Sequence, residues 1–438
     1  MTSIETPGPR SVSIVVPYYC DQVGLDRLFG ALAQQRPSPT AAWVGGVEVV
    51  VADDGSPVAP CTDRSPFPTR VVRQPDRGFR AGAARNLGVA ASTGEVLVFC
   101  DGDMAPEPGW LHAMADLSAP DEVVVGRRRH IDYGSCTLDE AMAFLDPDAD
   151  RRTRCIPAVL PEPEWLAEGY RRTADLRRVD PENWRLVISA SMSCSRQLFD
   201  ELGGFDESFD HYGGEDWDLA YRALNCGAVL LHRPDAVAWH DGPDWAGRGP
   251  DPAQKRRERR MLAVRIPRPS TRPTEWSADD PLDAHEAGEL LERVPGRPVP
   301  AMIITVTSGT DAVDGEWADT IAALHPTDVA WGAELRWSGS ASETTVPIDQ
   351  WHQRVRLHVD LRRPVRLPDG AGDRLLRLTE PGGCGRIEVW EGDETALVAT
   401  ATWHLCRETR RSGPASGTSG APLVLEPLDL DPDEAAGD

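Results

Sequence analysis

The sequence predicts an α/β fold, and two observations support this. Apolar β-forming runs alternate with an amphipathic helical pattern in the order strand, helix, strand, which is typical of parallel strands joined by right-handed crossovers. Polar or special residues stand at the ends of three apolar runs, at Pro17, Asp53 and Asp101. In open α/β sheets the ligand crevice lies at the carboxyl ends of the strands. We therefore expect one binding crevice in the first half of the chain.

The opening strand, helix and second strand follow from local patterns. Residues 11–17 are predominantly apolar and end at a proline, which predicts a buried strand. A turn then leads to apolar residues spaced as on one face of an amphipathic helix. These residues are Leu25, Leu28, Phe29 and Leu32. The apolar run at 47–51 predicts the second strand, and it leads into Asp53 and Asp54.

A third strand is expected at Val96–Cys100, followed directly by Asp101, Gly102 and Asp103. The glycine permits a turn that brings both carboxylates to an open cleft. Clustered carboxylates repel each other unless a cation joins them, and oxygen ligands with open positions suit Mg²⁺ or Mn²⁺ carrying a diphosphate better than zinc. The alternative is that these acids only cap the strand.

Acids also stand where a later helix is expected to begin. Glu215 and Asp216 follow two glycines, and Trp217 comes next. The helix dipole favours carboxylates in a first helical turn, which is one explanation. The other is a general base beside an acceptor hydroxyl, with the tryptophan offering a flat face to a sugar ring. His240 follows an apolar strand, where a histidine is either structural or part of a metal shell.

Composition excludes several classes of function. The 438 residues carry a formal net charge of −24, which argues against nucleic acid or anionic membrane as the main partner. No apolar run reaches the roughly twenty residues of a membrane helix, and neither a Walker A motif nor a G-x-G-x-x-G turn occurs. The nine cysteines lack paired metal spacing. We therefore expect no zinc, no disulfides and a cytoplasmic protein, and the arginine-rich composition suggests a bacterial source.

The motifs, taken in order, resemble family 2 glycosyltransferases and look most like the bacterial chondroitin-polymerase type. The resemblance covers residues 11–245, and its specificity comes from the order of the motifs. They are Ser13-Ile14-Val15-Val16-Pro17, Asp53-Asp54-Gly55-Ser56, Gly78-Phe79-Arg80, Ala84-Arg85-Asn86, Asp101-Gly102-Asp103-Met104, Gly213-Gly214-Glu215-Asp216 and Trp239-His240.

The resemblance implies a GT-A fold, that is, a Rossmann-like sandwich of nucleotide-diphospho-sugar transferases, and inverting sugar transfer with Mn²⁺ or Mg²⁺. It implies Asp216 as the catalytic base, Glu215 as its support, and Trp217 at the acceptor. The implied metal ligands are Asp103, His240 and Asp101. The implied nucleotide and donor residues are Pro17, Tyr19, Asp53, Asp54, Gly78, Arg80, Arg85 and Asp101.

The function expected from this resemblance is transfer of a sugar from a nucleotide-diphosphate sugar, most of all a UDP-sugar, to a hydroxyl acceptor. The product would be a polysaccharide, a glycan or a glycosylated natural product. Two alternatives stay open at this stage: a binding or scaffold protein that has kept the fold and lost the activity, and a sugar nucleotidyltransferase.

The rest of the chain divides by composition. Residues 1–10 form a polar lead-in, and residues 107–185 give no chemistry. Residues 246–299 are basic and Pro-rich, which indicates a linker or a lid. Residues 300–410 predict a second, β-rich α+β domain that could recognise acceptor or mediate homo-oligomer formation. Residues 411–438 predict a disordered acidic tail.

Overall fold

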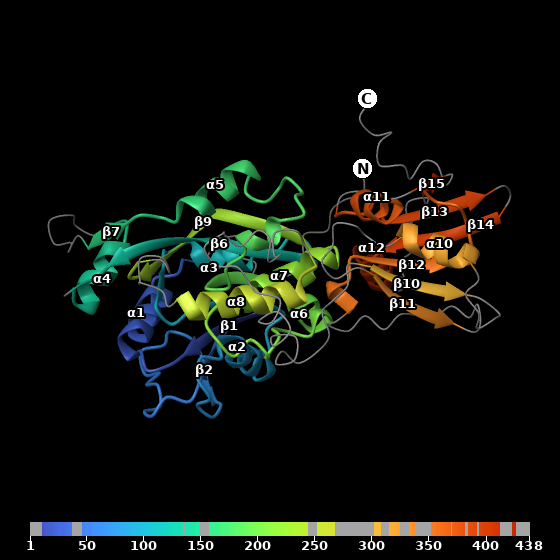
Figure 1. Ribbon diagram of the computed structural model, residues 1–438. Helices are drawn as coiled ribbons and strands as arrows, with labels where there is room; N and C mark the ends of the chain where they lie inside the picture. Colours follow the sequence, from blue (N-terminus) through green and yellow to red (C-terminus); the bar gives the residue numbers. More distant parts are fainter. Residues whose placement is uncertain are drawn as a thin grey trace. The chain divides into compact units, whose positions relative to one another are not determined.

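The computed structural model describes most of the first half of the chain and parts of the second (Figure 1). The described residues are 11–36, 46–134, 136–148, 157–243, 252–267, 302–307, 315–324, 333–338, 352–368, 370–381, 384–391, 394–411 and 423–425. The chain forms two compact units, one of Met1–Ala220 with Val229–Glu258 and one of Tyr221–Ala228 with Arg259–Asp438. The predicted lead-in and most of the predicted linker and tail lie outside the described residues.

The first unit is built on a nine-stranded mixed sheet with the order β3-β2-β1-β4-β8-β6-β9-β5, and β7 pairs with β6 at one side. Strands β3, β2, β1 and β4 are parallel, β8 is antiparallel to both of its neighbours, and β6 and β9 are parallel. The strands are β1 Val12–Tyr18, β2 Val47–Asp53, β3 Thr69–Arg73, β4 Val96–Cys100, β5 Met104–Pro106, β6 Glu122–Asp132, β7 Ala158–Leu160, β8 Ser191–Ser195 and β9 Val229–Asp241.

Strand register explains why the three expected polar ends meet. Val12 of β1 pairs with Val47 of β2 on one side and with Val96 of β4 on the other. The three strands therefore start level and run in the same direction. Their carboxyl ends, where the crevice is expected, lie at the same side of the sheet, and the expected parallel arrangement of β1 and β2 is confirmed.

Helices cover both faces of this sheet, as an α/β sandwich requires. Helices α1 (Gln22–Ala33) and α3 (Trp110–Ala115) pack on one face, where they share a core with β1, β2 and β4. Helices α2 (Ala81–Ala90) and α6 (Arg196–Leu202) pack on the other. The first unit also contains α4 (Leu138–Leu145) and α5 (Glu164–Arg172), while α7 (Glu215–Asn225) and α8 (Pro252–Arg265) each continue past its boundary.

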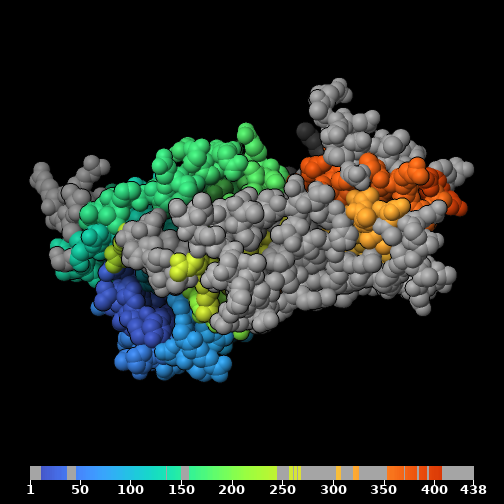
Figure 2. Space-filling model, viewed as in Figure 1, coloured from blue at the N-terminus to red at the C-terminus, as the bar shows by residue number. Residues whose placement is uncertain are grey.

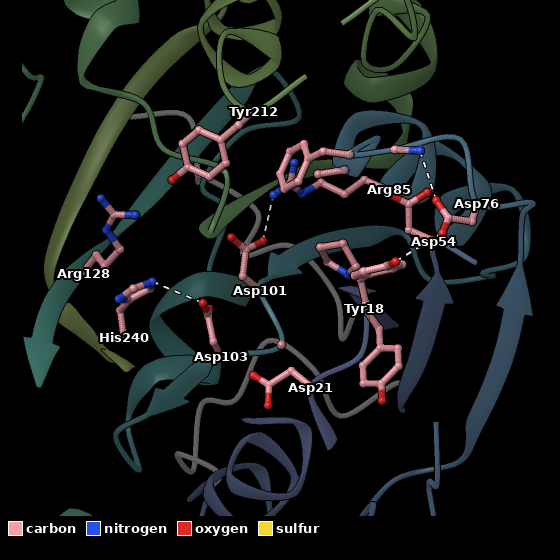
Figure 3. Close-up of a pocket in the computed structure, with 16 residues that line it drawn as sticks. Tyr18, Asp21, Asp54, Asp76, Arg85, Asp101, Asp103, Arg128, Tyr212 and His240 are labelled. Atoms are coloured by element: carbon pink, nitrogen blue, oxygen red, sulfur yellow. Dashed lines mark hydrogen bonds and ion pairs between the residues drawn. The ribbon is translucent and has the colours of Figure 1, made fainter. Parts of the chain in front are cut away.

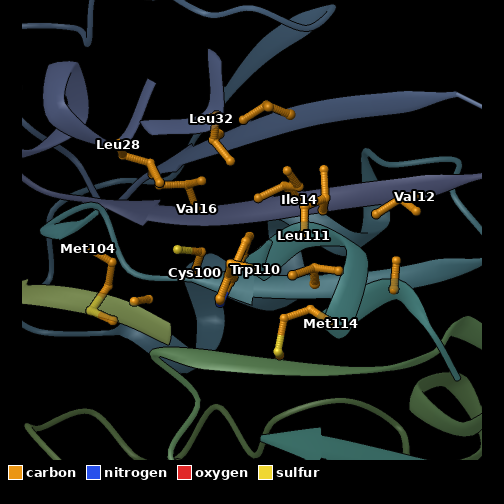
Figure 4. Packing of buried hydrophobic residues seen from close by; sticks show 14 of the residues in the cluster. Val12, Ile14, Val16, Leu28, Leu32, Cys100, Met104, Trp110, Leu111 and Met114 are labelled. Carbon is orange, nitrogen blue, oxygen red and sulfur yellow. The ribbon is translucent and has the colours of Figure 1, made fainter. Parts of the chain in front are cut away.

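The core between α1, α3 and the sheet uses alternate residues of each strand (Figure 4). Ile14 and Val16 of β1 point into it, together with Leu28 of α1, and all three are fully buried. Trp110 of α3 is also buried, and its indole N–H donates to the Ser191 hydroxyl at 2.9 Å. This alternation has period two, as expected for strands covered on both faces, and it fixes the register that aligns the site.

Two expectations about local structure are wrong. Nine unpaired cysteines were expected, but Cys136, at the turn before α4, is disulfide-bonded. Cysteine spacing does not reveal this, because pairing depends on the distance between residues in space. The run 186–194 also predicts a strand, yet the strand begins only at Ser191, and Asn183–Leu186 form a 3₁₀ helix.

The second unit has a six-stranded mixed sheet with the order β11-β10-β12-β14-β13-β15. Its strands are β10 Met302–Thr307, β11 Ala333–Ser338, β12 Leu357–Leu361, β13 Arg386–Glu391, β14 Glu394–Ala401 and β15 Leu423–Leu425, and helices α10 (Gly315–Leu324), α11 (Ala371–Leu378) and α12 (Thr402–Arg411) accompany them. Apolar residues of β10, β12, β13, β14 and α11 form its core. Within the described part of the chain, no helix has the length and apolarity needed to span a bilayer.

Candidate active site

A pocket of about 390 Å³ opens at the carboxyl ends of β1, β2 and β4 (Figure 3). It brings together eight residues of the predicted donor and metal sets, from six separate segments of the chain. These residues are Pro17, Tyr19, Asp54, Gly78, Arg85, Asp101, Asp103 and His240. Asp54 and Asp76 lie on one side of the pocket, and Asp103, His240 and Arg128 lie on the other.

The Asp54 side of the pocket has the features of a nucleotide site. The Tyr19 hydroxyl donates to the Asp76 carboxylate at 3.2 Å, and the Tyr19 ring is half exposed, so that it offers a face for stacking. Asp54 accepts from the Gln74 amide at 2.6 Å and from the backbone N–H of Arg80 at 2.9 Å. Asp54 thus holds the loop that joins β3 to α2 against the pocket.

Two predicted donor residues do not line this pocket. Asp53 is fully buried, where one carboxylate oxygen accepts from the Ser56 backbone N–H at 2.8 Å and the other lies 3.4 Å from Arg73. Asp53 is the last residue of β2 and Asp54 the first of the loop after it, and only Asp54 lines the pocket. The Arg80 side chain turns toward Glu207, at 3.6 Å, and only the backbone N–H of Arg80 serves the pocket loop.

Asp103 and His240 form the metal-side pair. Antiparallel pairing of β5 with β9 places Met104 opposite His240. Asp103, the residue before Met104, therefore lies beside His240, with Nε2 of His240 3.2 Å from Oδ2 of Asp103. His240 Nδ1 lies 3.2 Å from the Gly242 carbonyl, and it must carry the proton there because a carbonyl only accepts. Nε2 is then the ring nitrogen that faces the Asp103 carboxylate. That contact requires a proton or a cation between the two atoms.

Asp101 does not join that pair. It is bound to Arg85, with a guanidinium nitrogen 2.7 Å from its carboxylate. Among the described residues, no group of three or more His, Cys, Asp or Glu side chains is arranged to hold a metal ion. The predicted three-residue ligand set is therefore not assembled. Two protein ligands still fit Mg²⁺ or Mn²⁺, which commonly take one or two protein groups and complete their shell with phosphates and water.

Arg85 connects the pocket to the predicted base. It is 3% exposed and binds Asp101 at 2.7 Å and Glu215 at 3.0 Å. Burial alone would lower the pKa of Arg85, but the carboxylates of Asp101 and Glu215 outweigh burial and raise that pKa. The guanidinium is permanently charged and its bonds are made inside the protein. Arg85 therefore positions carboxylates at the edge of the pocket.

Asp216 follows Glu215 in the first turn of α7 and is partly exposed. Burial, together with the adjacent Glu215 carboxylate, raises the pKa of Asp216 to about 7. A carboxylate with this pKa can take a proton from an acceptor hydroxyl near neutral pH and is a better base than an ordinary aspartate. Trp217 lies edge-to-face with Trp184 and Trp165, with ring centroids 5.9 and 6.4 Å apart.

Two glycines precede the predicted base and fix the turn that leads to it. Gly213 and Gly214 have φ values of +92° and +96°, which L-residues with a Cβ rarely adopt. A Cβ on Gly214 would also come within 2.8 Å of the Phe209 ring. The turn that aims Glu215 and Asp216 therefore requires glycine at this position.

We expect Gly214→Ala to impair both stability and turnover. The left-handed backbone alone costs about 1–2 kcal/mol for a residue with a Cβ, and the Phe209 contact adds to this. The measurement is urea unfolding with steady-state kinetics. Gly109→Ala is the matched control, because Gly109 has a negative φ and no atom within 4 Å of a built Cβ. Equal stability and turnover in both variants would show that the turn does not position the base.

Several lining residues were missed by sequence reasoning. Phe79 and Tyr212 lie within or beside the quoted motifs, and their rings, 5.2 Å apart, close one side of the pocket. Asp76 stands just before the Gly-Phe-Arg motif. Arg128 had no local signal, because it lies in the stretch that gave no chemistry and reaches the pocket only through the pairing of β6 with β9.

Comparison with known proteins agrees with this geometry. Residues 13–202 match the family model described as "Glycosyl transferase family 2", and residues 179–238 match one described as "N-terminal domain of galactosyltransferase". A hyaluronan synthase of Pasteurella multocida is 30% identical over 213 residues, which are 45% of this chain and 21% of that protein. A chondroitin synthase of Pasteurella multocida strain Pm70 is 27% identical over 245 residues, 53% of this chain and 25% of that protein.

This chain thus spans about a quarter or less of the length of these two relatives. Among solved structures, the mannosyltransferase PcManGT from Pyrobaculum calidifontis in complex with GDP-Man and Mn²⁺ aligns with a TM-score of 0.37 at 20% identity. That alignment covers 59% of this chain and 64% of the other. Such a weak structural likeness adds no argument to the sequence match. Residues 13–202 thus resemble glycosyltransferase family 2, and the unit that contains them has the GT-A fold.

Proposed function

We propose that this protein transfers a sugar from a nucleotide-diphosphate sugar to a hydroxyl group of an acceptor, with inversion at the anomeric carbon. One observation carries the proposal. The pocket at the strand ends has the Asp103–His240 pair on one side, and Arg85 links it to Glu215 and so to the adjacent Asp216. Inverting transfer requires the leaving diphosphate and the attacking hydroxyl on opposite sides of the anomeric carbon. The Asp103–His240 pair would serve the diphosphate, and Asp216 would serve the hydroxyl.

The donor would lie across the pocket. Its base would stack on Tyr19 near Asp54 and Asp76, and its diphosphate would reach the metal-side pair. Asp103 and His240 would hold a divalent cation, and this cation would neutralise the negative charge that develops on the departing diphosphate. The His240 tautomer set by the Gly242 carbonyl leaves Nε2 as the ligating atom.

The reaction would be a single displacement. The acceptor oxygen bonds to the anomeric carbon while the bond from that carbon to the diphosphate oxygen breaks, and the hydroxyl proton passes to the Asp216 carboxylate. Glu215, tied to Arg85 at 3.0 Å, fixes the start of α7 and so the position of Asp216. The nucleoside diphosphate leaves with the bonding electrons, which balances the step.

Donor and metal can be tested together. We expect titration with UDP-, GDP- and dTDP-sugars in the presence of Mn²⁺ to show binding of one donor class, and EDTA to abolish it. Asp103→Ala should weaken Mn²⁺-dependent binding by about tenfold or more, because it removes one of two protein ligands. Asp139→Ala, which changes an acid in the first turn of α4, is the control. Binding that is indifferent to both EDTA and Asp103→Ala would contradict the metal role.

Binding of no donor at all would favour the scaffold alternative. Formation of a nucleotide sugar from a sugar phosphate and a nucleoside triphosphate would favour the nucleotidyltransferase. The cytoplasmic location, the lid at residues 246–299 and oligomer formation through the second unit stay predictions.

A further inference from the structure

A second cavity, of about 320 Å³, lies in the first unit between helix α5 and strands β6 and β9. Arg128 of β6 lines both this cavity and the donor pocket, so the two adjoin at its side chain. Figure 3 shows Arg128 beside His240 on the donor-pocket side. Helix α5 and the turn after it, in green, lie on the surface of the unit in Figure 2. No step of the proposed reaction uses this cavity.

The cavity contains an unsatisfied hydrogen-bond acceptor. His232 is 4% exposed and lines the cavity, with its ring stacked on Tyr170 at 3.6 Å and 2°. Its Nδ1 lies 2.8 Å from the Asp175 carboxylate, and its buried Nε2 has no hydrogen-bond partner. Burial lowers the pKa of His232, so the ring is neutral, donates from Nδ1 and presents a lone pair at Nε2. A ligand hydroxyl would satisfy that atom.

The cavity also contains a cation without a counter-ion. Glu162 accepts from Arg127 at 2.8 Å and lies 3.2 Å from Arg129, which neutralises that carboxylate. Arg128, between them in sequence, forms no ion pair with any residue that the structure describes, and its buried Nε has no hydrogen-bond partner. A buried or half-buried guanidinium gains most from a carboxylate or phosphate, which it can bind through two parallel bonds.

The backbone around Asp175 is strained in a way that serves the cavity. Ala174, Asp175 and Leu176 have φ values of +50°, +57° and +64°, three successive non-glycine residues in the left-handed region. Such residues persist only where surrounding contacts hold them, and they cluster at ligand sites. Here Asp175 binds His232 twice, through its carboxylate to Nδ1 and through its carbonyl to the backbone N–H at 3.1 Å.

We propose that the second cavity binds a sugar that carries an anionic group, as the part of the acceptor that is remote from the reacting hydroxyl. His232 Nε2 accepts from a ring hydroxyl, and Arg128 binds the carboxylate or phosphate. The adjoining face of α5 carries Trp165, which is 49% exposed and edge-to-face with Trp217, the residue after Asp216. An acceptor of at least two sugar units would run along α5 to the base. The acceptor role rests on the proposed function.

The test titrates the whole protein with glucuronate, glucose 6-phosphate, glucose and inorganic phosphate, using saturation-transfer NMR and calorimetry. We expect one of the two sugar acids to bind about tenfold or more tightly than glucose, since a charge-assisted hydrogen bond contributes at least that much. The comparison of the two acids distinguishes a carboxylate from a phosphate. His232→Phe, which keeps the stack on Tyr170, and Arg128→Gln should each weaken this binding about tenfold.

Arg172→Gln is the matched control, because Arg172 is exposed at the end of α5, pairs with Asp180 and lines neither cavity. UDP titration with Mn²⁺ of the parent protein, of His232→Phe and of the control variant reports separately on the donor pocket and on folding, and Arg128→Gln is left out of that comparison because Arg128 lines both cavities. Failure of the sugar acids to bind a protein that binds UDP overturns this inference and leaves the proposed function standing. Equal binding of inorganic phosphate and the sugar acids, insensitive to His232→Phe, also overturns it. Sugar-acid binding without any donor binding supports the cavity and contradicts the transferase role.

Discussion

Asp216→Asn is expected to lower kcat about 10²- to 10⁴-fold while donor binding stays within about twofold of the parent protein, because it removes the base and keeps the shape of the side chain. Kinetic measurements with the donor identified by titration give the turnover rate, and calorimetry gives the affinity for the donor. Asp218→Asn offers no useful control, since Asp218 is fully buried. Asp210→Asn, on the exposed loop before the two glycines, is suitable. A variant at Asp216 that retains near-parental kcat would exclude it as the base.

The same residue predicts a pH dependence. The pKa of Asp216 is raised to about 7, so the base is protonated and inactive in acid, and kcat should rise about tenfold per pH unit until it levels off near that pKa. The sign for stability is opposite. Between about pH 4, the ordinary pKa of an aspartate, and about pH 7, the Asp216 carboxyl keeps its proton in the folded state and has lost it in the unfolded state. The free energy of unfolding therefore falls as the pH rises through this range. A kcat limb near pH 4 would contradict the assignment.

Arg85→Met is expected to destabilise the first unit by about 3–5 kcal/mol, the range seen when one partner of a buried ion pair is removed. Arg85 is 4% exposed at its side chain and Glu215 8%, so removal leaves the Glu215 carboxylate desolvated without a counter-charge, and Asp101 loses its 2.7 Å partner. Methionine keeps most of the side-chain volume. The loss therefore measures charge pairing and not a cavity.

Urea unfolding of Arg85→Met and of the parent protein measures this loss of stability. Arg36→Met provides the comparison, because Arg36 forms an ion pair of similar length with Asp148, at 2.8 Å, but is 56% exposed. Exposed pairs contribute about 0–1 kcal/mol, so the control should change little. A loss of stability of the same size in both variants would show that burial of the Arg85 pairs has no special energetic weight.

The sequence predicted the elements that local patterns define. Apolar runs located β1, β2 and β4, and their polar ends located the crevice, because parallel neighbouring strands bring their carboxyl ends to the same side of the sheet. The sequence did not show that Asp54 lines the pocket and Asp53 does not. β2 ends at Asp53, which is fully buried, and Asp54 follows in the loop and lines the pocket, but no local pattern shows where the strand ends.

What the sequence could not predict depends on contacts between distant segments. Arg85, an implied donor residue, lines the pocket, but its ion pairs are with Asp101 and Glu215, which lie 16 and 130 residues away. Arg128 enters the pocket through the pairing of β6 with β9, and Cys136 is paired where spacing suggested free thiols. No local periodicity encodes these contacts.

The neighbouring carboxyl ends of β1, β2 and β4 have a consequence for the evolution of such chains. The three loops that follow these strands each supply pocket residues, while the strand register is fixed by the buried core and not by the loops. Insertions or exchanges in one loop should therefore alter which donor is accepted without displacing the residues carried by the other two. Donor preference among related chains is expected to diverge faster than the catalytic framework, and chimeras that exchange only the loop between β2 and β3 would reveal it.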